Sequence, residues 1–169
     1  MAAHLDFVKH NEKYVSSFDK GHLPLPPSKK CIIVTCIDAR VEPASQLGIQ
    51  LGEAHVIRNA GGLAEDALRS IIISQRLLGT REIAVFHHTD CGMLTFSTDQ
   101  LRQIVKDADP GNTAVADQVD KIDFLEFNNL EASVKKDAAF LKDNPLVLKD
   151  TSITGWVYAV ETGKVTQVV

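Results

Sequence analysis

Two short segments of this 169-residue chain carry side chains that could do chemistry. Residues 36–40 read Cys-Ile-Asp-Ala-Arg, and residues 88–92 read His-Thr-Asp-Cys-Gly. Together they offer two cysteines and one histidine, a ligand set that leaves one coordination position of a zinc ion open and therefore suits catalysis. A structural zinc site needs a fourth protein ligand, for which Asp38 and Asp90 are the nearby candidates. The residue types thus predict a metal site, with catalytic zinc as the better match.

Both segments follow apolar runs that are typical of buried strands, so the fold can bring them together. The carboxyl ends of parallel strands meet at one edge of a sheet, where open α/β proteins bind their ligands. If the first strand stays extended past its end, Cys36, Asp38 and Arg40 point the same way, because side chains alternate with a period of two. His88 and Cys91 are three residues apart and in a tight turn can bind one ion together. We expect the two loops to converge on that ion.

The other cysteine and the other histidines have simpler interpretations. Cys31 is read as a small core residue, since its position in the strand is of opposite parity to that of Cys36. His87 continues its strand and faces away from the site, where it packs or supports the metal ligands. Asp90 is expected to hydrogen-bond to the backbone of its turn and is given no chemistry. The remaining histidines are read as surface or core residues: His4, His10, His22 and His55.

The elements that must position these loops alternate between strand and helix. Apolar, β-branched runs predict strands over residues 31–37, 54–58 and 82–87, and an edge hairpin over 153–160 and 164–168. Apolar residues at three- and four-residue spacings predict a helix over 63–78 that ends at Gly79. A second helix is expected over 129–142, before Pro145. This alternation indicates an α/β fold with a mainly parallel central sheet flanked by helices.

The composition excludes several classes of protein. Hydrophobic residues make up 44% of the chain and charged residues 24%, which excludes global disorder. A net charge of −4 argues against a nucleic-acid or anionic-membrane partner. The first residues lack the apolar core of a secretory signal, and no run approaches a membrane span. Three cysteines without an export signal indicate a reducing compartment, so we expect a cytoplasmic protein.

We expect residues 1–169 to form a single domain with three parts. Residues 2–18 show weak helical periodicity and are expected to form an N-terminal arm helix. Residues 21–28 contain three prolines and are expected to be an extended connector. Residues 30–169 form the catalytic core. A short helix on such a tether often packs on something other than its own neighbours, a second subunit being one candidate.

With these residues assigned, the chain resembles the β-class carbonic anhydrases. The resemblance rests on Cys-x-Asp-x-Arg at 36–40 and His-x-x-Cys-Gly at 88–92, and it extends to Arg-Asn-Ala-Gly-Gly at 58–62 and the helix that follows. It is strong over residues 30–96 and points to the compact branch of the family, which also contains carbonyl sulfide hydrolases. The resemblance implies a sheet of order 2-1-3-4 with an additional edge strand. It also implies a homodimer or higher homo-oligomer, with the N-terminal helix of each subunit draped over its partner.

The same resemblance implies roles for the site residues. One zinc ion per subunit is held by Cys36, His88 and Cys91, with water or hydroxide in the fourth position. Asp38 and Arg40 match the family's dyad, in which the carboxylate orients the hydroxide and the guanidinium holds that carboxylate off the metal. If this pair breaks, Asp38 can become the fourth ligand, and lower pH is expected to favour that closed form.

The implied activity is the addition of zinc hydroxide to the carbon of a small linear molecule. Carbon dioxide would give bicarbonate, and carbonyl sulfide would give carbon dioxide and hydrogen sulfide; carbon disulfide hydrolases share the fold. Gly61 and Gly62 are expected to permit close backbone approach around the substrate pocket. The alternative is a non-catalytic zinc-binding domain with Asp38 as a permanent fourth ligand. A thiol-based redox protein is disfavoured, because a Cys-x-x-Cys motif is absent from the sequence.

Overall fold

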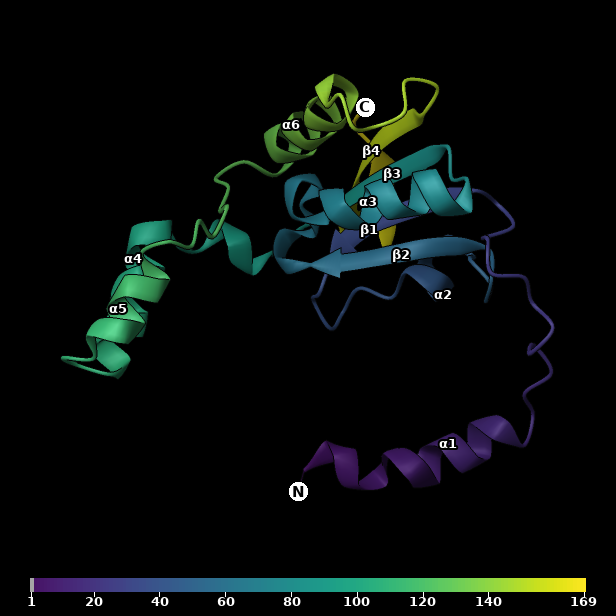
Figure 1. Cartoon of the computed structure of the whole chain (residues 1–169), viewed down its shortest axis with the longest axis horizontal. Coiled ribbons are helices and arrows are strands. Elements are labelled where there is room, and N and C mark those ends of the chain that lie inside the picture. Colours follow the sequence, from purple (N-terminus) through teal and green to yellow (C-terminus); the bar gives the residue numbers. More distant parts are fainter. Residues whose placement is uncertain (1) are drawn as a thin grey trace.

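The computed structural model describes residues 2–169 and is built around a five-stranded sheet (Figure 1). The strands lie in the order β2–β1–β3–β4–β5, with β1, β3 and β4 inside the sheet. Strands β1 to β4 pair in parallel, and β5 pairs antiparallel with β4. The predicted fold class and strand order are therefore confirmed. The bounds are β1 (Cys31–Cys36), β2 (Ala54–Asn59), β3 (Glu82–His88), β4 (Ser152–Ala159) and β5 (Lys164–Gln167).

Helices cover both faces of the central strands, which explains why β1 is apolar at every position but Thr35. On one face, α3 (Ala64–Leu78) and α6 (Leu130–Asp143) pack on the sheet. The core on that face contains Ile32, Val34, Ile71, Ile83, Val85 and Leu141. On the other face, the short helix α2 (Pro43–Leu47) and the segment after it cover a smaller core that includes Ile33, Phe86 and Trp156.

Local signals fix the ends of the longer helices. Gly79 ends α3 with φ +73°, as expected for a glycine C-cap. The side chain of Asn129 accepts a hydrogen bond from the backbone of Ala132 and starts α6. The helix stops at Asn144, directly before Pro145. Both predicted helices are thus present, with bounds shifted by about one residue.

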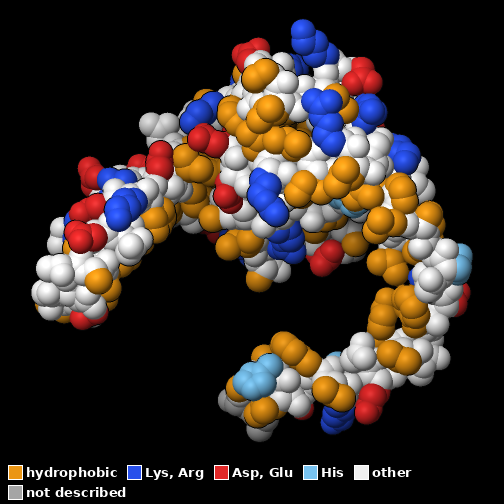
Figure 2. All heavy atoms as spheres, in the orientation of Figure 1, with side chains coloured by type: hydrophobic (Ala, Val, Ile, Leu, Met, Phe, Trp, Pro, Cys, Tyr) orange, Lys and Arg blue, Asp and Glu red, His pale blue; other side chains and the backbone are white. Residues whose placement is uncertain are grey.

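Two helical segments project from this core (Figure 1). On one side lie α4 (Thr98–Ala108) and α5 (Thr113–Val119), which contact each other. On the other side, the chain before β1 leads away to a 3-10 helix (Ala3–Asp6) and α1 (Phe7–Val15), and every residue from 2 to 20 is exposed. Figure 2 shows apolar side chains along this arm. Within residues 2–169, the helices are all too short or too polar to cross a membrane.

Candidate metal centre

The first ligand loop leaves β1 at Cys36 and turns at once. The backbone NH of Val41 donates to the carbonyl of Asp38 (3.0 Å), and the NH of Arg40 donates to the Asp38 carboxylate (2.8 Å). The expectation that the strand stays extended to residue 40 is therefore wrong. Asp38 and Arg40 meet because the aspartate side chain bonds to the backbone two residues on, which closes a tight turn.

The second ligand loop leaves β3 at His88 and is anchored to the end of β4. The hydroxyl of Thr89 donates to Glu161 (2.7 Å) and accepts from the backbone NH of Val160 (3.0 Å). Asp90 has φ +52°, so the chain reverses there and brings Cys91 back towards His88. This left-handed turn allows His88 and Cys91, which are three residues apart, to face the same point.

The two loops bring three buried ligand atoms together, as the sequence predicts. The sulfurs of Cys36 and Cys91 and a ring nitrogen of His88 all lie within 4.8 Å of one another. The Nδ1 atom of His88 lies 2.8 Å from the carbonyl of Thr89 and donates to it, so Nε2 keeps its lone pair. In the part of the chain that the structure describes, this buried Nε2 atom has no hydrogen-bond partner. An unpaired buried acceptor beside two sulfurs fits a zinc ion.

The proton affinities of the two thiols are coupled. The pKa of Cys36 falls to about 4 because Cys91 donates a hydrogen bond to its sulfur, while burial acts in the opposite direction. The same bond and burial raise the pKa of Cys91. Burial and the shared hydrogen bond therefore disfavour ionisation of both thiols at once. A divalent cation bound between the two sulfurs would offset the free-energy cost of ionising the second thiol.

The predicted pair of Asp38 and Arg40 borders this cluster. Arg40 donates to both carboxylate oxygens, from Nε (3.0 Å) and from Nη2 (2.7 Å). These bonds hold the pKa of Asp38 well below its usual range. The Oδ2 atom of Asp38 lies 3.8 Å from Nε2 of His88. The carboxylate thus faces the metal position while the guanidinium holds it.

Two further residues support the site in roles that the sequence does not predict. Arg58 on β2 donates to the carbonyl of Cys36 (3.0 Å) and to that of Asp38 (2.7 Å). Asp90 accepts from Nη1 of Arg40 (2.7 Å), so its carboxylate bonds to a side chain 50 residues away and not to its own turn. Nothing in the local sequence indicates such a long-range bond. Arg58 could have been suspected from the 58–62 motif alone.

The two predicted glycines lie in the 3-10 turn Ala60–Gly62, and both are buried with positive φ. A Cβ atom on Gly62 would lie 2.8 Å from the carbonyl oxygen of Phe86 and 2.9 Å from the backbone nitrogen of Cys36. A Cβ atom on Gly61 would lie 3.0 Å from Met93. At Gly62 the turn therefore lies directly against the backbone of β1 and β3, the two strands that end at the predicted metal ligands.

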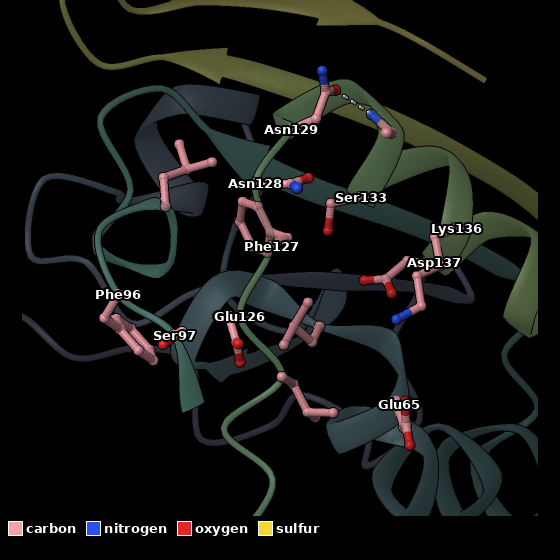
Figure 3. A pocket seen from close by; sticks show the side chains of 14 residues that line it. Glu65, Phe96, Ser97, Glu126, Phe127, Asn128, Asn129, Ser133, Lys136 and Asp137 are labelled. Carbon is pink, nitrogen blue, oxygen red and sulfur yellow. Dashed lines mark hydrogen bonds between the residues drawn. The ribbon is translucent and has the colours of Figure 1, made fainter. Parts of the chain in front are cut away.

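An apolar wall and a larger pocket adjoin the ligands. Cys36 and Cys91 cluster with Leu63, Met93, Phe96, Leu125 and Phe127. Beside this wall lies a pocket of about 650 Å³ between the start of α3, residues 94–97, residues 125–129 and α6 (Figure 3).

His87 lies behind the pocket, in the core. It is fully buried, its ring stacks on Phe127, and its Nε2 atom lies 3.1 Å from Asp137. Asp137 also accepts from the backbone NH of Ala64 at the start of α3. His87 therefore packs and hydrogen-bonds inside the core, and packing was one of the two roles predicted for it.

Cys31 is buried on the other face of the sheet, as a small core residue would be, and burial raises the pKa of its thiol to about 11.

Comparisons with known proteins cover nearly the whole chain. A family model described as carbonic anhydrase matches residues 31–165. The chain is 46% identical over 164 residues to beta-carbonic anhydrase 1 of Mycobacterium tuberculosis, which is 96% of each protein. It is 35% identical over 177 residues to a carbon disulfide hydrolase of Saccharolobus solfataricus, covering 93% of this chain and 84% of that protein. The solved structure of a carbonic anhydrase from Glaciozyma antarctica has a TM-score of 0.91 and 52% identity over 95% of each chain.

Proposed function

Since this chain belongs to the β-carbonic anhydrase family and is an enzyme of that family, we propose that it hydrates carbon dioxide to bicarbonate with one Zn²⁺ ion per subunit. Cys36, His88 and Cys91 are the proposed zinc ligands. The observation that carries the proposal is the buried Nε2 atom of His88, which has an unused lone pair beside two sulfurs. The thiolate and imidazole donors are those that zinc prefers.

The ion, when bound, is a Lewis acid that makes a water molecule acidic near neutral pH. The chain's own residues supply orientation. We assign Asp38 as the residue that accepts a hydrogen bond from the attacking water, because its Oδ2 atom lies 3.8 Å from the nitrogen that would bind the ion. Arg40 keeps this carboxylate ionised, hence an acceptor only, and keeps it from moving onto the metal. The site pairs a metal position with an oriented acceptor, as hydration requires.

The surroundings suit a small neutral substrate. The apolar wall of Leu63, Met93 and Phe127 can accommodate a linear molecule without charge, and we assign Gly61 and Gly62 to the substrate pocket. Carbonyl sulfide has the same shape and the same electrophilic carbon, and a relative named as a carbon disulfide hydrolase supports sulfur-containing substrates as the second possibility. The non-catalytic alternative requires Asp38 to bind the metal. Both carboxylate oxygens of Asp38 accept hydrogen bonds from Arg40 instead, which favours the enzyme.

We also propose a homodimer formed through the N-terminal arm. Large apolar side chains on this arm are exposed, among them Leu5, Phe7, Val8, Val15 and Phe18. A separate apolar groove lies on α4, α5 and the segment after α5, and it is lined by Val105, Val115, Val119, Ile122 and Phe124. A second copy of the chain would cover such surfaces. Light scattering on the full chain should give a dimer or a multiple of it, and on a chain lacking residues 2–18 a smaller assembly.

The remaining assignments follow from the same proposal. Residues 1–169 would act as one domain of this family, with arm, connector and core as described. The proposed location is the cytoplasm, because reducing conditions keep Cys36 and Cys91 free to bind the metal. Carbon dioxide or carbonyl sulfide, water and a second subunit are the proposed partners.

The test is a parallel assay of one zinc-loaded sample at neutral and alkaline pH. Carbon dioxide hydration and sulfide release from carbonyl sulfide are measured side by side, together with zinc per chain. Fast hydration with little sulfide supports the carbonic anhydrase, and the reverse identifies a carbonyl sulfide hydrolase. The variant His88→Gln should lose zinc, whereas His22→Gln, a change at an exposed histidine, should keep it. Neither reaction at either pH with zinc bound would favour the non-catalytic domain.

A further inference from the structure

Arg40 is shared between two carboxylates, of which the proposed mechanism uses only one. Two of its nitrogens donate to Asp38, while Nη1 donates to Oδ2 of Asp90 (2.7 Å) and Nη2 also donates to the backbone carbonyl of Asp90 (3.0 Å). Each of its three guanidinium nitrogens therefore has at least one partner. The planar, forked geometry of the group fixes its orientation when both sides are bound.

The two carboxylates come from different ligand loops. Asp38 follows Cys36 after β1, and Asp90 lies between His88 and Cys91 after β3. The guanidinium of Arg40 is consequently a bridge between the two loops that carry the metal ligands. With Asp90 bound, the guanidinium is held from the β3 side and cannot follow Asp38 if that carboxylate moves towards the metal position.

We propose that Asp90 is a positioning residue that anchors Arg40 and, through Arg40, keeps Asp38 in its orienting position next to the metal. The proposal rests on the proposed role of Asp38. Asp90 does not reach the ligand cluster itself, because its side chain is 71% exposed and points to Arg40. Its φ of +52° is tolerated by asparagine and glycine, so the carboxylate can be removed without straining the turn.

The chain offers a control ion pair at the other end of the strands, where β3 and β4 begin. Asp150 pairs with Arg81 at 3.2 Å, and its side chain is 72% exposed, against 71% for Asp90. Arg81 and Arg40 are also similarly exposed, at 44% and 48%. Asp150 and Arg81 precede β4 and β3, whereas the metal ligands lie at the carboxyl ends of the strands. The two ion pairs are thus alike in residue types and exposure and differ in their position relative to the site. Asp90 alone has a positive φ, so the asparagine variants are the closer comparison.

The experiment compares Asp90→Asn and Asp90→Gly with Asp150→Asn and Asp150→Gly, each in the zinc-loaded full chain. Glycine removes the acceptor, whereas asparagine keeps an acceptor oxygen without the charge. We expect kcat/KM to fall by about tenfold in Asp90→Gly and by about threefold in Asp90→Asn. Both Asp150 variants should retain it. In an Arg40→Ala background, Asp90→Gly should cost less than about twofold, because its effect passes through Arg40.

A spectroscopic measurement tests the same point without turnover. In cobalt-loaded protein, the visible spectrum reports the ligands of the metal, and we expect that of Asp90→Gly to shift towards the spectrum of Arg40→Ala. If Asp90→Gly lowered kcat/KM by the same factor in the wild type and in the Arg40→Ala background, the proposal would be overturned, since a change in the loop backbone would then explain the effect. Unchanged kcat/KM and an unchanged cobalt spectrum in Asp90→Gly would overturn it as well. If the wild-type chain turns over neither substrate, the proposed function fails, and the cobalt spectra alone decide the role of Asp90.

Discussion

Replacing Gly62 by alanine should disturb this protein far more than the same change at another glycine with a similar backbone. Gly62 has φ +71°, and an added Cβ atom would lie 2.8 Å from the carbonyl carbon of Thr35 and 2.8 Å from the carbonyl oxygen of Phe86. These are backbone atoms of β1 and β3, so no side-chain rotation can relieve the contact. Either the 60–62 turn moves outward or the ends of the two strands separate.

The expected loss of stability has two parts. An L-residue in the left-handed region costs about 1–2 kcal/mol, and overpacking in a close-packed interior costs about 1–3 kcal/mol. Their sum, about 2–5 kcal/mol, is a large share of the roughly 5–15 kcal/mol that stabilises a typical domain. For a chain of this size each kcal/mol lowers Tm by about 2–4 °C, so the expected decrease is about 4–20 °C.

Gly48 provides the control that separates the two parts. It has φ +66°, and a Cβ atom added there would have no neighbour within 4 Å. Gly48→Ala should therefore show only the backbone strain, about 1–2 kcal/mol. Thermal and urea unfolding of both variants should be compared at one protein concentration, because Tm depends on concentration in an oligomer.

The comparison of Gly62→Ala with Gly48→Ala also tests the link between this turn and the metal site. The added Cβ atom on Gly62 would also lie 2.9 Å from the backbone nitrogen of Cys36, so the proposed zinc ligand must shift with the strand end. Gly62→Ala should accordingly retain less zinc against a competing chelator, and Gly48→Ala should retain as much as the wild type. Equal losses of Tm in the two variants would refute the steric reasoning, and full zinc retention in Gly62→Ala would refute its link to the site.

Three further predictions concern the charged groups of the site. Arg40→Ala should lower kcat/KM by at least about tenfold with zinc per chain unchanged; a fully active variant would contradict the role of the dyad. Arg40 lowers the pKa of Asp38, so the folded chain binds a proton at this carboxylate less readily than the unfolded chain does. The ion pair therefore stabilises the fold above the ordinary carboxyl pKa of about 4, and this stabilisation is lost as the pH falls towards the lower pKa of the folded state. Urea unfolding of metal-free protein between pH 6 and pH 3 should show the advantage of the wild type over Asp38→Asn shrinking towards the acid end, and a constant advantage would contradict the sign. In metal-free protein, a small thiol reagent should modify Cys36 before Cys31, since their pKa values are about 4 and about 11, and zinc should protect Cys36; mass spectrometry of the modified peptides gives the order.

Much of the sheet could be predicted because its strands carry their own signals. β1 is covered on both faces, so its sequence is apolar at every position but Thr35, and β3 shows the same pattern over most of its length. α3 ends at a glycine for a local reason, the left-handed conformation that its C-cap requires. The predicted elements do not include α2, α4 or α5, because α2 is only five residues long and α4 and α5 bury few residues. α5 has only seven residues and gives little periodicity to read. α4, by contrast, is strongly amphipathic and begins with a capping box at Ser97 and Gln100, so its signals are present in the sequence.

The sequence by itself determined the identity and order of the chemical groups: two cysteines and a histidine at strand ends, with an aspartate and an arginine beside the first of them. Side-chain chemistry and strand-end placement are local properties, so they can be read along the chain. The bonds between groups far apart in the chain, however, depend on the fold. The bond from Arg40 to Asp90 and the bonds from Arg58 to the first ligand loop join residues between 20 and 50 positions apart. Such bonds depend on the distance between strand ends in the folded sheet, and no pattern in the local sequence encodes that distance.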